Sequence, residues 1–208
     1  MALDKNPRLA ISAGHGMNSR KAGAKDPGAS IKRENDTEAD FALRFSKHIF
    51  EDFQALFSGR RKGFVVLIDK VKYYKADDVA ANKDCDLFIE FHLNSGGGTG
   101  TEVLYEATKN KKFAIALSKE IAASWHGKNR GAKHRTDLAV LTPHDGMYQV
   151  LAELFFADNP KDLKKFRDNA PEPELAVVNR ILKHYGWKPV TSLPRKWSKL
   201  KKLTYKAY

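Results

Sequence analysis

Apolar residues along the chain form short runs, and these runs are separated by longer stretches in which apolar positions recur at helical spacing. The short runs predict strands at residues 9–11, 64–68, 87–93, 101–105, 138–141 and 149–156. The helical spacing predicts helices at residues 36–57, 77–83, 111–124 and 172–184. Because strands alternate with helices, we expect an α/β fold: a mostly parallel twisted sheet flanked by helices, in a single domain. Sites in such sheets form at the carboxyl ends of the strands.

The composition changes near residue 188. We expect one catalytic domain over residues 1–187 and a short basic C-terminal tail over 188–208, in which lysines are interleaved with Trp197, Tyr205 and Tyr208. The chain has 208 residues, of which 42% are hydrophobic, so a domain of this size can bury a core.

The formal net charge of +12 predicts attraction to a polyanion. Nucleic acid, an anionic membrane face and an acidic cell-wall polymer would all be drawn to such a surface. Charge alone does not choose among these partners.

Several classes are disfavoured by what the sequence lacks. A single cysteine, Cys85, allows neither an intramolecular disulfide nor a cysteine-based zinc cluster. The N-terminus has no basic segment followed by a long apolar stretch, so we expect no signal peptide and synthesis in the cytoplasm. No window approaches 18 apolar residues, so we expect no transmembrane segment.

Three of the predicted strands end in residues that can carry chemistry. His15 follows the first strand and is flanked by glycines, which leave its ring open to a cleft. Strand alternation places Glu90, His92 and Asn94 on one face. Glu153 lies inside an apolar run, where a carboxylate is paired, metal-bound or raised in pKa.

Two histidines and one carboxylate form a donor set of the kind that holds a catalytic zinc ion, and a separate carboxylate then serves as general base. Each residue alone also has a structural explanation, since a histidine can satisfy itself with local hydrogen bonds and Glu153 could be a buried salt-bridge partner. Their coincidence at three strand ends strengthens the hypothesis of a metal hydrolase, but spacing alone leaves the structural explanation about equally open.

Three segments carry a resemblance to a known family. They are AISAGHGMNSRKAGAKDPGA, FIEFHLNSGGGTGTEVLYE and VLAELFFADNPKDL. In this order they resemble the Gly-His-Gly loop, the second-histidine segment and the closing glutamate segment of zinc-dependent N-acetylmuramoyl-L-alanine amidases. The resemblance covers residues 8 to about 187.

The resemblance implies a role for each matching residue. His15 and His92 match the two zinc histidines, and Glu153 matches the catalytic glutamate that activates the zinc water and returns its proton to the leaving amine. The third zinc ligand of the family is a glutamate at the start of the next helix, where KRENDTEADFAL offers Glu34 and Glu38. We favour Glu38, because a ligand on a helix is more rigidly placed, and Glu34 stays open as the alternative.

The sequence departs from the family pattern at two places. Met17 and Asn18 follow Gly16, where the family loop usually carries an acidic residue. Glu90 stands where a small or apolar residue is common in the family, so it either orients His92 or neighbouring backbone, or faces solvent. We also expect that His144 could line the cleft.

The function implied by the resemblance is hydrolysis of the amide between N-acetylmuramic acid and L-alanine in peptidoglycan, with Zn²⁺ as cofactor. We expect wall lysis by a monomeric, phage endolysin-like enzyme that reaches the wall after release. The alternatives are a bacterial autolysin with the same chemistry, or a non-catalytic basic module that binds wall polymer or nucleic acid. No nucleic-acid-binding motif is visible in the sequence, so we expect peptidoglycan and not nucleic acid as partner.

Overall fold

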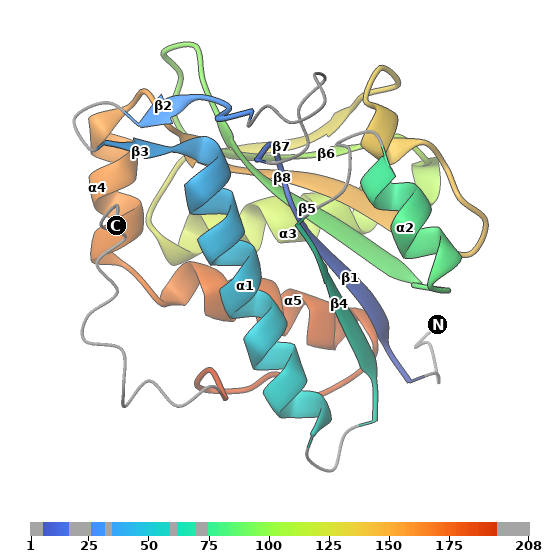
Figure 1. Cartoon of the computed structure of the whole chain (residues 1–208). Coiled ribbons are helices and arrows are strands. Elements are labelled where there is room, and N and C mark those ends of the chain that lie inside the picture. The colour runs from blue at the N-terminus through green and yellow to red at the C-terminus, as the bar shows by residue number, and fades with distance from the viewer. Residues whose placement is uncertain (1–5, 17–25, 32–34, 59–61, 70–74, 195–208) are drawn as a thin grey trace.

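The computed structural model describes residues 6–16, 26–31, 35–58, 62–69 and 75–194. In this part of the chain a six-stranded sheet has the order β4-β1-β5-β8-β6-β7 (Figure 1). Its strands are β1 (Arg8–Ala13), β4 (Phe64–Ile68), β5 (Leu87–Asn94), β6 (Thr101–Tyr105), β7 (Asn129–His134) and β8 (Tyr148–Phe156). Neighbouring strands run parallel except β6 and β8, which are antiparallel. The predicted α/β fold with a mostly parallel sheet is confirmed.

The helices flank this sheet. They are α1 (Glu38–Phe57), α2 (Ala76–Asn82), α3 (Lys111–Ser124), α4 (Pro160–Asp168) and α5 (Glu172–His184). The small strands β2 (Ser30–Ile31) and β3 (Asp36–Thr37) form a separate antiparallel pair that leads into α1. Helix α1 begins where the Thr37 side chain accepts a hydrogen bond from the Asp40 amide, which satisfies one of the free donors at the helix start.

The two faces of the sheet bury different side chains. One face packs on α1, α3 and α5, and its largest buried residues include Phe41, Phe91 and Trp125. The other face is covered by α2 and by the 3₁₀ turn Ala139–Leu141, with Phe88 and Leu151 beneath them. Figure 1 shows α2 on the opposite side of the sheet from α1 and α5. By strand alternation, His92 of β5 and Glu153 of β8 lie on the α2 face, toward the carboxyl ends of their strands.

The strand predicted at residues 138–141 is wrong. Residues Ala139–Leu141 form a 3₁₀ turn, and the edge of the sheet is formed instead by β7, which pairs with β6. The apolar side chains of Val140 and Leu141 are buried against the α2 face of the sheet, although these residues do not pair with a strand. The pattern also missed α4, although Asn159 caps that helix and Pro160 occupies its first turn.

The end of the described chain remains in contact with the domain. Leu193 is buried in the core, and the Val190 amide donates to the Asn179 side chain. Residues 195–208 of the predicted basic tail lie outside the described residues. Of the described helices, none combines the length and the apolar character needed to cross a membrane.

Candidate metal and catalytic site

His15 lies immediately after β1, in the loop that the sequence predicts to be open to a cleft. Its φ of 61° falls in the left-handed region, which residues other than glycine seldom adopt. The loop is anchored on one side by the Gly14 amide, which donates to the Phe91 carbonyl at 3.0 Å, and on the other by the paired backbones of Gly16 and Asp26. These contacts hold a backbone conformation that is otherwise disfavoured, as is common at functional sites.

Glu38 is the first residue of α1, and its carboxylate is held by the backbone. Its Oε1 accepts from the Leu93 amide at 3.0 Å and its Oε2 accepts from the Ala29 amide at 2.8 Å. The side chain is almost completely buried. The start of the helix therefore presents this carboxylate in a fixed position.

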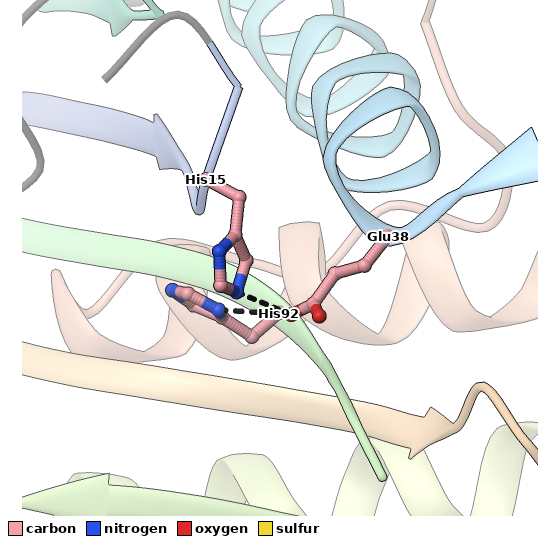
Figure 2. Close-up of side chains that lie close together, drawn as sticks. All are labelled: His15, Glu38 and His92. Atoms are coloured by element: carbon pink, nitrogen blue, oxygen red, sulfur yellow. Dashed lines mark hydrogen bonds and ion pairs between the residues drawn. The ribbon is translucent and has the colours of Figure 1, made fainter. Parts of the chain in front are cut away.

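The side chains of His15, Glu38 and His92 converge on one point (Figure 2). Glu38 Oε1 lies 3.1 Å from Nε2 of His15 and 3.0 Å from Nδ1 of His92. One ligand atom from each residue lies within 4.8 Å of the other two. Two imidazole nitrogens and a carboxylate oxygen are the donors that a catalytic zinc ion takes from protein, so this group could hold such an ion.

Two glycines leave the space that this arrangement needs. A Cβ at Gly14 would lie 2.1 Å from Cε1 of His92, and a Cβ at Gly28 would lie 2.6 Å from Oε2 of Glu38. Any larger residue at either position would displace a candidate ligand. Glycine at positions 14 and 28 therefore leaves room for the side chains of His15, Glu38 and His92.

The ring nitrogens that face away from the convergence point are also paired. Asp26 Oδ2 lies 3.0 Å from Nδ1 of His15, and Glu90 Oε1 lies 2.9 Å from Nε2 of His92. Carboxylates in this position orient histidine ligands and fix the tautomer of the ring. Glu90 is buried, so of the two possibilities left open by the sequence it contacts His92 and does not face solvent.

The charges at the site shift the pKa values of its members. Burial would lower the pKa of His15, but the hydrogen bond with Glu38 outweighs burial and raises it. Burial would raise the pKa of Glu38, but its hydrogen bonds with the two histidines hold that pKa far below its usual range. Without a metal ion these hydrogen bonds therefore favour the protonated form of the imidazoles and the ionised form of the carboxylate.

Glu153 lies beside His92, because the two residues are register partners in β8 and β5. On its other side Glu153 pairs in register with Glu102 of β6. Its Oε2 is buried and has no hydrogen-bond partner among the described residues. Burial raises the pKa of Glu153 to about 7, with a smaller contribution from Glu38. A carboxyl group with such a pKa can both accept and donate a proton near neutral pH.

A cavity of about 310 Å³ opens beside His15 and His92. Its polar lining includes His15, Asp26, Glu90 and His92, and other lining residues are apolar. The apolar side chains are those of Leu138, Ala139, Val140 and Leu151. The segment at 138–140, predicted as a strand, therefore helps to form the wall of the site.

The structure brings together His15, Glu38, His92 and Glu153, the four residues favoured by the sequence. Glu34, the alternative third ligand, lies outside the described residues. His144 is not among the residues that line the cavity, and its Nε2 lies 3.3 Å from Oδ2 of Asp77. Sequence reasoning gave no role to Asp26, although it belongs to the DPGA stretch of the first matching segment.

Comparison with known proteins identifies the class of this fold and site. The family model of N-acetylmuramoyl-L-alanine amidases matches residues 9–179. The chain belongs to this family and is an amidase of that type. No curated protein sequence matches it.

Solved structures of amidases share the fold. The catalytic domain of the amidase CwlV from Bacillus (Paenibacillus) polymyxa var. colistinus has a TM-score of 0.72 at 25% identity, covering 88% of this chain and 99% of that one. An N-acetylmuramoyl-L-alanine amidase from Clostridium difficile 630 has a TM-score of 0.71 at 23% identity, with 87% and 97% covered. The catalytic domain of CD27L, an endolysin targeting Clostridium difficile, has a TM-score of 0.67 at 23% identity, with 89% and 100% covered.

Proposed function

We propose that this amidase is zinc-dependent and cleaves the amide between N-acetylmuramic acid and L-alanine, with His15, Glu38 and His92 as metal ligands. The observation that carries the proposal is the convergence of these three side chains beside Glu153. A zinc ion held there would supply a Lewis acid and an acidified water.

Glu153 is the catalytic residue of this proposal. Its buried Oε2 would take the proton of the attacking water and transfer it to the alanine nitrogen as the C–N bond breaks. The products would be a free lactyl carboxylate on the muramic acid and a stem peptide with a free L-alanine amino group. The apolar wall at Leu138 and Val140 would exclude bulk water from the reacting amide.

Digestion of purified peptidoglycan, followed by mass analysis of the products, tests the bond that is cleaved. We expect stem peptides that begin with L-alanine and intact glycan strands. Cut glycan strands, or peptides cut within the stem, would show that the proposed bond is wrong. Removal of metal by a chelator should stop the reaction and added Zn²⁺ should restore it; activity that persists in metal-free protein would refute zinc dependence.

For the biological role we propose lysis of the cell wall, with peptidoglycan as partner. The net charge of +12 supports this role, since it would hold the enzyme on an anionic wall. Remodelling of the wall by an autolysin needs the same chemistry and is the alternative. Turbidity of a suspension of permeabilised cells distinguishes the two: a rapid and complete fall in turbidity is expected for a lytic enzyme, and limited release of stem peptides without lysis would favour remodelling.

A further inference from the structure

Glu90 is a buried carboxylate beside the candidate metal ligand His92. It lies in β5 two residues before His92, on the same face of the strand, and is only 4% exposed. A carboxylate in such a place is costly unless its oxygens are paired.

Both oxygens of Glu90 are engaged. Oε1 lies 2.9 Å from Nε2 of His92, and Oε2 accepts a hydrogen bond from the Ser12 hydroxyl at 2.7 Å. Ser12 is the register partner of Glu90 in β1, so the contact between them is built into the strand pairing. The sheet itself thus holds Glu90 in the orientation that meets the imidazole.

We propose that Glu90 is a positioning residue that sets which nitrogen of His92 faces the metal. When the ring is neutral, the contact of Glu90 with Nε2 would keep the ring proton on that nitrogen and leave the lone pair of Nδ1, which lies beside Glu38, available to a metal ion. This inference rests on the proposed metal site. It adds that the site depends on a Ser12–Glu90–His92 chain of contacts that runs across two strands.

The arrangement at the other histidine supports this role. Asp26 contacts Nδ1 of His15, so its Nε2 is the nitrogen that faces Glu38. The two imidazoles therefore present different nitrogens to the same point, and in each case a carboxylate occupies the opposite nitrogen. Carboxylate–histidine pairs with a purely structural role would not require that the remaining nitrogen of each ring face the same carboxylate, Glu38.

Zinc titration of the metal-free protein against a competing chelator tests the proposal. We expect Glu90→Gln to weaken zinc binding by about 10- to 100-fold, the usual effect of removing an outer partner of a metal ligand. Ser12→Ala leaves the carboxylate but removes its anchor, and we expect a smaller, measurable weakening.

Glu174→Gln is the matched control. Glu174 is a fully buried carboxylate of α5 that contacts Nδ1 of His48 at 2.8 Å, away from the site. Its substitution removes a buried charge from a histidine in the same manner, and zinc affinity should stay at the wild-type value. If Glu174→Gln and Glu90→Gln weakened zinc binding equally, general destabilisation would explain the loss, and the proposal would be overturned.

The remaining outcomes are also decisive. Wild-type zinc affinity in folded Glu90→Gln overturns the role of Glu90, and if that variant does not fold, unchanged affinity in Ser12→Ala overturns it. A ¹⁵N NMR spectrum of the zinc-loaded wild type gives an independent readout, since Nε2 of His92 should carry the proton; a proton on Nδ1 would contradict the proposal. Absence of zinc binding in the wild type would instead refute the proposed function, which keeps the two failures distinct.

Discussion

Gly14 offers the sharpest test of the geometry at the candidate metal site. A Cβ added at this residue would lie 2.1 Å from Cε1 and 2.2 Å from Nε2 of His92, whereas ordinary contacts begin at 3.4 Å. The imidazole of Gly14→Ala must therefore move by about 1.3 Å. The backbone cannot give way easily, because the Gly14 amide is bonded to the Phe91 carbonyl of β5.

The expected effect on metal binding follows from this displacement. A zinc–nitrogen bond is about 2.0–2.1 Å long, so a shift of about 1 Å removes the ligand. We expect zinc to bind at least about 100-fold more weakly, which corresponds to about 2.8 kcal/mol. Overpacking should also lower the free energy of unfolding of the metal-free protein by about 1–3 kcal/mol.

Gly127→Ala separates these two effects. A Cβ at Gly127 would lie 2.1 Å from Cζ2 of Trp125, which gives the same overlap with a buried aromatic ring. Trp125 belongs to the core on the other face of the sheet and takes no part in the site. We expect Gly127→Ala to lose a similar amount of stability and to keep wild-type zinc affinity.

Two measurements on each variant decide the outcome: zinc affinity by competition with a chelator, and urea unfolding of the metal-free protein. The reasoning is refuted if Gly14→Ala binds zinc as tightly as the wild type, because the ring of His92 would then not occupy the position described. It is also refuted if both variants lose zinc to the same extent, since the loss would then be a general result of overpacking.

Four further substitutions test other parts of the structure. Glu153→Gln should fold and bind zinc but lose amide hydrolysis by about 10²- to 10⁴-fold in the product assay, and normal turnover would remove Glu153 from the mechanism. Glu38→Gln should abolish stoichiometric zinc in metal analysis whereas Glu34→Gln should not; the reverse result would make Glu34 the ligand. His184→Phe should change the pH dependence of stability, because burial lowers the pKa of His184 from its ordinary 6.5 to about 4. The unfolded chain takes up the proton first, so the wild type should lose stability between pH 6.5 and 4, by at most about 3 kcal/mol because the partly exposed ring is screened by solvent, and the variant should retain it; parallel urea-unfolding profiles over this range would contradict this.

Most of the secondary structure could be predicted from the sequence, because in most elements the spacing of apolar residues matches the face that is buried. The predicted bounds of α3, α5, β4 and β6 match the structure. Strand β7 was missed because NRGAKH is polar and has no apolar alternation; its strand conformation depends on the ladder with β6, which local sequence does not show. The error at 138–141 has the related cause that a short apolar run indicates burial but not the kind of element.

The sequence could predict which residues of the candidate site lie near the ends of strands, but not which side chains contact one another. His15 follows β1, His92 lies near the end of β5, and Glu153 lies in the second half of β8, and parallel pairing brings these parts of the strands to one edge of the sheet. The partners of the imidazoles were not predictable, because the contact of Glu90 with Ser12 joins residues 78 positions apart and depends on strand register. Sequence reasoning could place Glu90 on the face of His92 but not decide what it touches.

The balance of charge at the site argues for a cation. Four carboxylates, those of Asp26, Glu38, Glu90 and Glu153, lie around only two imidazoles, and three of the four contact an imidazole directly. In the metal-free protein the raised pKa values of the two histidines favour their protonation, which would offset part of the negative charge of these carboxylates. A divalent cation would supply the same compensation and release the imidazole protons, because a histidine binds metal only when the coordinating nitrogen is unprotonated. The carboxylates that favour protonated histidines in the metal-free protein would then serve to orient neutral ones.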